Sequence, residues 1–354
     1  MPNRVSSILT ACALALGPGA AWAQAPARPA APTAVAPVTV EAAPPKVLKR
    51  QAQSFVEAYS VGTPKLDLIG RWREPICVKV VNLTPEQAAQ VKARVEQVAR
   101  GLGLQVRKPG CQSNIQIVLT SQPQAFLDKV AKADEYALGF HWRSDLAKAK
   151  AVTHPIQGWY KTATQSAHFG HDGLPFANLT SGPVGNPMAG AQAPAGSDIV
   201  NSGSLFGESH ASETLDIAEN GSPSGCAGSL INHCERSVFK NVLVVIDSRA
   251  VEGKELGALA DYLAMVSLSQ AKSLDGCNSL PSILDLMAKA PCAGRDTPDG
   301  LTAADATFLT ALYSANPEAR AASEQVDIAG RMSEALIKAS SAAQAGAGSG
   351  AKNH

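Results

Sequence analysis

A continuous apolar run from Asn241 to Asp247 constrains the fold of this chain more than any other feature of its sequence. The run reads Asn-Val-Leu-Val-Val-Ile-Asp, so an extended segment would project apolar side chains from both of its faces. A strand of this kind needs cover on each face and is typical of the interior of a layered sheet. The sequence therefore predicts a buried strand at 241–247.

Strand and helix patterns alternate along the rest of the chain. Cys77–Val81 and Asn114–Leu119 predict strands, and Thr84 begins a helix with Pro85 first and Gln87 third, which is the pattern of a capping box. Further helices are expected at 122–133, at 253–269, briefly at 282–285, from Thr302 onward and at 317–339. Strands interleaved with helices, some of the strands antiparallel, predict an α+β fold with a mixed sheet packed by helices.

The N-terminus has the pattern of an export signal. Arg4 provides a basic start, Val5–Ala21 is apolar, and Ala21-Trp22-Ala23 fits the small-x-small cleavage pattern. We expect cleavage after Ala23 and a periplasmic or secreted protein without a transmembrane segment. An alternative is lipoprotein processing at Cys12.

Composition divides the remainder of the chain. Residues 24–50 are rich in Ala and Pro and predict a linker, 51–339 a single main domain, and 340–354 a disordered tail. Residues 166–230 are dominated by Gly, Ser, Pro, Ala and Asn. A structureless loop of this length is uncommon inside a compact domain, so we interpret the segment as a long insertion in the main domain.

Six cysteines remain after the signal is removed: Cys77, Cys111, Cys226, Cys234, Cys277 and Cys292. An even number in an exported chain indicates disulfides, and six cysteines allow 15 pairings. We predict nearest-neighbour pairing, which closes three local loops. Zinc is the competing interpretation, but the chain has no C-x-x-C pair.

The charge balance argues against a nucleic-acid partner. The chain has 31 Lys and Arg against 30 Asp and Glu, and loss of Arg4 with the signal leaves 30 of each. Such a chain lacks the basic excess of a nucleic-acid binder. Within it, Arg71-Trp72-Arg73 predicts a cation–π or structural contact near the first strand rather than a ligand site.

Three residues are candidate binding residues. Trp159 and Tyr160 are expected in an extended segment beside the insertion, and Asp261 lies in the apolar helix at 253–269. A partly buried carboxylate needs a partner or a shifted pKa. We expect a hydrogen bond from a neighbouring loop or a pair with Lys254 or Arg249, and a binding or acid–base role is the alternative.

Two weaker patterns point to hydrolysis. His168 and His171 form an H-x-x-H pair that could hold a metal, although no acidic or Cys spacing completes a known ligand set. Gly207-Glu-Ser-His-Ala211 approximates a nucleophile elbow around Ser209, but no buried strand precedes it. Solvated loop histidines are the preferred interpretation, and no cofactor is expected.

Six short motifs along the chain are distinctive: Arg71-Trp72 with Pro75-Ile-Cys77, Cys111 with Asn114, Pro155–Tyr160, Leu259–Leu268, Pro281–Leu284 and Leu301–Asp305. In these motifs the chain resembles an uncharacterised family of exported proteobacterial proteins. The resemblance covers about 51–338 without the insertion. Family members have Pro after the first cysteine where this chain has Val78. The family has no assigned activity, so the resemblance implies export and a single folded unit.

The strand at 241–247 and the helix that begins at Lys254-Glu255 resemble the active helix unit of zinc metallopeptidases. Their H-E-x-x-H motif places two imidazoles on zinc, and the corresponding residues here are Lys254 and Ala258. Neither can replace an imidazole, so the resemblance implies at most a degenerate zincin-like scaffold.

These patterns predict a non-catalytic binding or envelope-assembly protein, whose partner is an envelope protein or a small ligand. The alternative is a hydrolase that uses the insertion histidines or Ser209.

Overall fold

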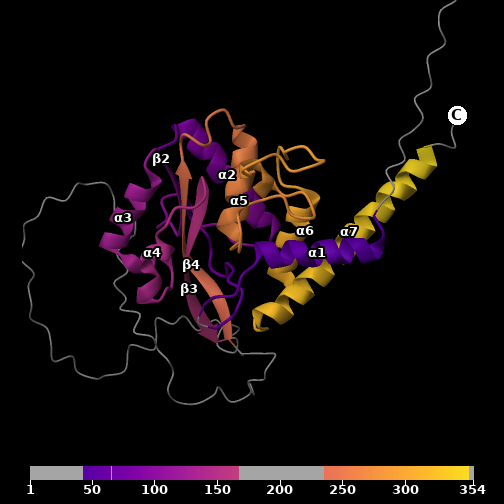
Figure 1. Cartoon of the computed structure of the whole chain (residues 1–354), viewed down its shortest axis with the longest axis horizontal. Coiled ribbons are helices and arrows are strands. Elements are labelled where there is room, and N and C mark those ends of the chain that lie inside the picture. Colours follow the sequence, from indigo (N-terminus) through magenta and orange to yellow (C-terminus); the bar gives the residue numbers. More distant parts are fainter. Residues whose placement is uncertain (1–42, 65, 167–234, 351–354) are drawn as a thin grey trace, which may run out of the picture. The chain divides into compact units, whose positions relative to one another are not determined.

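A four-stranded mixed sheet organises the computed structural model, which describes residues 43–64, 66–166 and 235–350 (Figure 1). The strands are β1 (Val78–Val81), β2 (Ile115–Thr120), β3 (Ile156–Ser166) and β4 (Glu235–Asp247). Their order is β1-β2-β4-β3, with β1, β2 and β4 parallel and β3 antiparallel to β4. The fold is therefore α+β with a mixed sheet packed by helices, as the sequence predicts.

β4 is the interior strand that the apolar run predicts. Val242, Val244 and Ile246 face the larger apolar cluster, while Leu243 and Val245 face a smaller one on the other side of the sheet. All five are at most 2% exposed. The strand begins at Glu235, six residues before the apolar run, because its first half pairs with the long strand β3.

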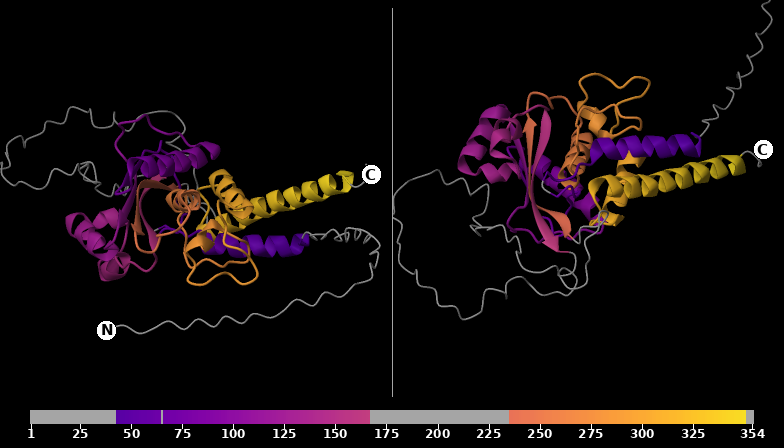
Figure 2. Two further views of the ribbon diagram at one scale, coloured as in Figure 1. Left: turned by 90° about the horizontal axis from the view of Figure 1, so that it is seen from above. Right: turned by 60° about the horizontal axis from the view of Figure 1, so that its bottom comes forward.

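Helices cover the two faces of the sheet. On one face lie α2 (Pro85–Gly101) and α5 (Leu256–Leu268), and on the other lie α3 (Pro123–Ala133), the 3₁₀ turn η1 (Glu135–Leu138) and the short helix α4 (Leu146–Ala149) (Figures 1 and 2). A further short turn, η2 (Arg143–Asp145), precedes α4. The larger cluster also includes residues of α1 (Pro45–Tyr59), α6 (Ala303–Ser314) and α7 (Ala321–Gly350).

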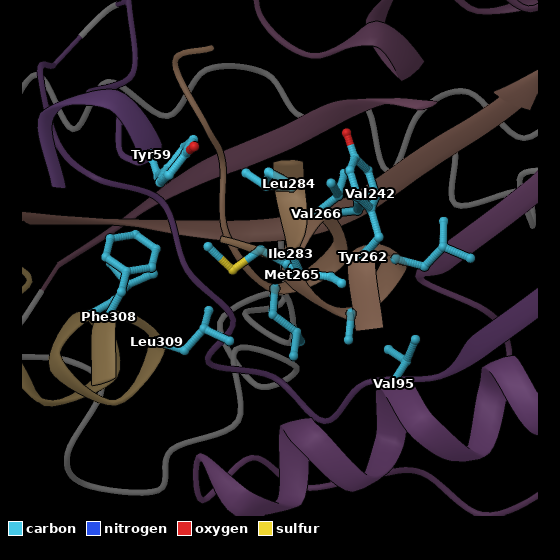
Figure 3. Packing of buried hydrophobic residues seen from close by; sticks show 14 of the residues in the cluster. Tyr59, Val95, Val242, Tyr262, Met265, Val266, Ile283, Leu284, Phe308 and Leu309 are labelled. Atoms are coloured by element: carbon cyan, nitrogen blue, oxygen red, sulfur yellow. The ribbon is translucent and has the colours of Figure 1, made fainter. Parts of the chain in front are cut away.

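α5 is buried all round. Every residue from Ala258 to Leu268 is buried, so the rest of the fold covers this helix on more than one face. Figure 3 shows Met265 and Val266 packing among Val95 of α2, Val242 of β4 and Ile283 of the 3₁₀ turn η4 (Ile283–Met287).

Capping boxes begin three of the described helical segments. Thr84 accepts a hydrogen bond from the Gln87 backbone in a capping box with Pro85 at the first helical position, as predicted. Thr302 with Asp305 begins α6 in the same way, and Ser282 with Asp285 begins η4. These caps satisfy N–H groups that a helix start leaves without intrahelical partners.

Two of the three predicted disulfides lie in the described residues. Cys77 bonds to Cys111 and Cys277 bonds to Cys292, with Cα–Cα distances of 6.2 Å and 5.1 Å. Nearest-neighbour pairing is therefore confirmed for these four cysteines. The predicted pair Cys226–Cys234 lies outside the described residues.

Two predicted boundaries are wrong. α1 begins at Pro45, inside the predicted linker 24–50. The apolar pattern does not reveal these first turns, because they carry Lys46, Lys49 and Arg50 and the buried face of the helix starts only at Ala52. α7 continues to Gly350, through most of the predicted tail. The expected signal, Cys12, and all but the first residue of the predicted insertion lie outside the described residues. Within the part of the chain that the structure describes, no helix is both long enough and apolar enough to cross a membrane.

Arg71 forms a buried ion pair with Glu324 in the first turn of α7, and both side chains are 0% exposed. Its guanidinium also donates to the carbonyls of Leu312 and Ala315. Burial lowers the pKa of Arg71 to about 9, and the side chain still carries its charge at neutral pH. Within the Arg71-Trp72-Arg73 motif, Arg71 thus forms a structural contact, which fixes the connection between α6 and α7.

Candidate binding groove at the edge strand

β3 lies at the edge of the described sheet and presents backbone groups outward. The Asp247 N–H donates to the Pro155 carbonyl (2.8 Å), which makes these two residues a hydrogen-bonded pair. Because such pairs alternate along an antiparallel ladder, the register places Gln157 and Trp159 in bonded pairs with β4. The N–H and C=O groups of Gly158 and Tyr160 therefore point away from β4, toward the outer edge.

The turn after η1 approaches this edge. Gly139 has φ 82°, a region that L side chains rarely adopt. A Cβ at Gly139 would overlap the carbonyl oxygen of Tyr160. Glycine thus allows the chain around residue 139 to lie against the outer edge of β3.

A groove of about 210 Å³ lies between this turn and the strand. Its lining residues are Thr63, Pro64, Leu138, Gly139, Phe140, Ala149, Gly158, Trp159, Tyr160, Thr162 and Gln270. The groove brings together five separate parts of the chain at the edge of the sheet.

The predicted binding residues Trp159 and Tyr160 both line this groove, but their polar side-chain atoms form hydrogen bonds within the protein. The Trp159 indole N–H donates to the Ala149 carbonyl (2.7 Å). The Tyr160 hydroxyl lies 2.7 Å from the Val266 carbonyl oxygen, and burial raises the pKa of Tyr160 well above its usual range. Both side chains therefore serve in packing, and it is the backbone of β3 that faces the groove.

Three exposed aromatic side chains belong to the segment 136–142, of which Leu138, Gly139 and Phe140 line the groove. Tyr136, Phe140 and Trp142 are 59%, 39% and 60% exposed, and the rings of Phe140 and Trp142 meet edge to face at 5.2 Å. Aromatic residues are only 5% of the chain, and most of those in the described part are buried. Exposed aromatic clusters are characteristic of contact surfaces. These three side chains were not predicted as a contact surface, although Glu135–Trp142 alone contains three of the chain's 17 aromatic residues.

Gln270 contributes an unused acceptor. Its Oε1 atom is buried and accepts no hydrogen bond from any residue that the structure describes. Buried polar atoms usually have partners, so this amide has capacity for a further donor beside the groove.

Asp261, the third predicted residue, is not in the groove. Its carboxylate pairs with Arg94 of α2 and accepts a hydrogen bond from the Leu301 N–H (3.0 Å). The expected loop hydrogen bond is therefore present, but the expected partners are wrong, since Arg249 instead pairs with Asp247 (2.8 Å). Asp261 ties α5 to α2 and to the loop before α6.

The metallopeptidase-like positions serve the start of α5. Lys254 lies before the helix, and Glu255 is its N-cap, with its carboxylate accepting a hydrogen bond from the Ala258 N–H (2.7 Å). Backbone hydrogen bonds from Gly257 and Ala258 lower the pKa of Glu255. The carboxylate at the general-base position thus caps the helix.

The candidate hydrolytic residues His168, His171 and Ser209 lie outside the described residues. Within the described part, one group of three potential metal ligands occurs, Cys277, Asp285 and Cys292. Both of its sulfur atoms are used in a disulfide. The expectation that no cofactor is needed stays a prediction.

Comparisons of the chain with protein-family models, with curated proteins and with solved structures gave no match.

Proposed function

We propose that this protein is an exported, non-catalytic binding protein that captures an extended segment of a partner protein in the bacterial envelope. The single observation that carries the proposal is the exposed Phe140–Trp142 pair beside the outer edge of β3. The export signal in the sequence and the two disulfides support an oxidising compartment.

An extended polypeptide fits this site better than a compact ligand. The outward N–H and C=O groups of Gly158 can pair with a further strand, which is a recurrent mode of peptide recognition, whereas the turn at Gly139 lies against the Tyr160 carbonyl. The groove of about 210 Å³ has room for one side chain of that segment. Phe140 and Trp142 then cover the segment, since rigid aromatic rings provide much of the binding energy at interfaces.

The first experiment selects linear peptides from a random phage-displayed library against the mature protein. The affinity of a selected peptide is then measured by fluorescence anisotropy. We expect Phe140→Ala with Trp142→Ala to weaken binding at least about tenfold. Val326→Ala is the matched control, because Val326 is also an exposed apolar side chain (61%) but lies on α7.

Backbone pairing makes a second, independent prediction for the same peptide. N-methylation removes one N–H at a time, and strand addition uses N–H groups at alternate residues. Binding should therefore fall with methylation at every second residue and persist at the residues between them. Equal sensitivity at all positions, or affinity unchanged in the aromatic double variant, would contradict the proposal.

A further inference from the structure

A second cavity, also of about 210 Å³, lies at the start of β3 and shares no lining residue with the groove. His154 and Pro155 precede β3, and Lys254 follows β4. Ala250 and Asp275 also line the cavity, and a further part of the wall is Leu286–Lys289, which lies within the loop closed by the Cys277–Cys292 disulfide.

Asp275 organises the polar side of this cavity. Its carboxylate accepts a hydrogen bond from the Ser273 hydroxyl (2.8 Å) and lies 3.3 Å from His154 Nε2 and 3.4 Å from Lys289 Nζ. The Ser273 hydrogen bond, followed by those of His154 and Lys289, lowers the pKa of Asp275. The carboxylate is therefore ionised at neutral pH and positions the imidazole and one ammonium group at the rim.

The cavity has a surplus of positive charge. Lys254 lines it and forms no ion pair with any residue that the structure describes. Lys254 and Lys289 together provide two ammonium groups against the single carboxylate of Asp275. An anion entering the cavity would meet a net attraction, and two ammonium groups can both donate hydrogen bonds to it.

Part of the cavity wall is apolar. Leu286 is 8% exposed, and Met287, Ala288 and Pro155 complete this surface. Pockets that combine an apolar wall with a few convergent polar groups are typical of small-molecule sites.

We propose that this cavity binds a small organic anion, with its acidic group between Lys254 and Lys289 and its apolar part against Leu286–Ala288. The shared chemistry is a carboxylate or phosphate on an apolar stem. The proposal does not depend on the peptide groove, because the two sites have no residue in common.

The Cys277–Cys292 disulfide couples this site to the redox state of the protein. Four lining residues lie inside its loop, and Asp275 lies two residues before Cys277. Cys277 itself is exposed to solvent and has φ 57°, an uncommon conformation for a residue with a side chain. Opening the disulfide would free this wall, so the anion should bind more weakly to the reduced protein.

The test uses benzoate as the probe and NMR shifts of backbone amides in the full mature protein. We expect saturable shifts at Ala250, Lys254 and Ala288. Lys254→Ala with Lys289→Ala should weaken benzoate binding about tenfold, and Lys272→Ala, an exposed lysine outside the cavity, should not. Asp275→Asn should strengthen binding, because it removes the competing negative charge.

Three further measurements complete the test. Benzylamine, the charge-reversed probe, should cause no saturable shift at these amides. Inorganic phosphate has a negative charge but no apolar part, so it tests whether the site also requires an apolar stem. We expect phosphate to bind more weakly than benzoate. Cys277→Ser with Cys292→Ser should weaken benzoate binding, whereas Cys77→Ser with Cys111→Ser should not. Binding of benzylamine as tight as that of benzoate, absence of saturable shifts, or full affinity in the double-lysine variant would overturn the proposal.

Discussion

Removal of Glu324 should be the most damaging single change to a charged residue in α7. In Glu324→Ala, the guanidinium of Arg71 stays 0% exposed but loses the one carboxylate with which it pairs among the described residues. Loss of one partner of a buried ion pair costs about 3–5 kcal/mol of unfolding free energy, because the remaining charge has neither water nor a counter-charge. Arg71 keeps its hydrogen bonds to the carbonyls of Leu312 and Ala315, so we expect the lower end, about 3 kcal/mol.

The same helix provides the matched control. Asp327 pairs with Arg331 at 3.0 Å, but its side chain is 39% exposed. Exposed pairs of this kind contribute less than about 1 kcal/mol, so Asp327→Ala should have a small effect. Urea unfolding followed by circular dichroism measures both variants.

Two further measurements separate ion pairing from lost packing. Arg71→Met combined with Glu324→Leu should cost less than Glu324→Ala alone, because no isolated charge remains. The cost of Glu324→Ala should change little with added salt, whereas any cost of Asp327→Ala should fall. If Glu324→Ala destabilised the protein no more than Asp327→Ala does, the buried-pair reasoning would be refuted.

Two other predictions concern the disulfides and Asp305. In the chain-entropy model, loss of the Cys77–Cys111 bridge (separation 34) should lower the free energy of unfolding by about 4 kcal/mol, and loss of Cys277–Cys292 (separation 15) by about 3 kcal/mol. Urea unfolding of the two double-Ser variants measures both losses. A larger loss for Cys277–Cys292 would contradict the prediction. Burial raises the pKa of Asp305 above its ordinary value of 3.8, and the hydrogen bonds from Ser282, Ile283 and Thr302 only partly offset this rise. The folded protein thus holds this proton more tightly than the unfolded chain, so its contribution to stability is full below pH 3.8 and is lost as the pH rises through the raised pKa. The stability of wild type relative to Asp305→Asn should therefore decrease over that window, and an increase would show that the sign is wrong.

Local patterns were sufficient for the parts of the fold that depend on neighbouring residues. The β4 run, the Thr84–Gln87 capping box and the start of α6 at Thr302 were all predictable, because each depends on side chains within a few positions of one another. The two described disulfides also close local loops. By contrast, the strand order and the antiparallel direction of β3 depend on pairing between Ile156–Ser166 and Glu235–Asp247, which are distant in the sequence.

The candidate site was predictable only in part, for a related reason. Trp159 and Tyr160 are conspicuous as adjacent aromatic residues, but their side chains pack inward and the strand backbone faces the groove. The contributions of Gly139 and Gln270 depend on tertiary contacts, to Tyr160 and to the groove, that no local pattern contains. Asp261 shows the converse case, because a carboxylate in an apolar helix indicates a partner but does not identify Arg94 of a distant helix.

The burial of α5 explains why a binding role at the sheet edge is more consistent with this structure than chemistry on the helix after β4. A catalytic helix needs a face open to substrate, whereas Ala258 to Leu268 are all buried. Its two acidic groups are also engaged, Glu255 by the helix cap and Asp261 by Arg94 and Leu301. Along β3, by contrast, the Gly158 N–H and C=O groups face outward beside exposed aromatic rings. Free backbone groups next to exposed apolar surface are costly to leave uncovered in an isolated protein, so the β3 edge is where a partner would gain most.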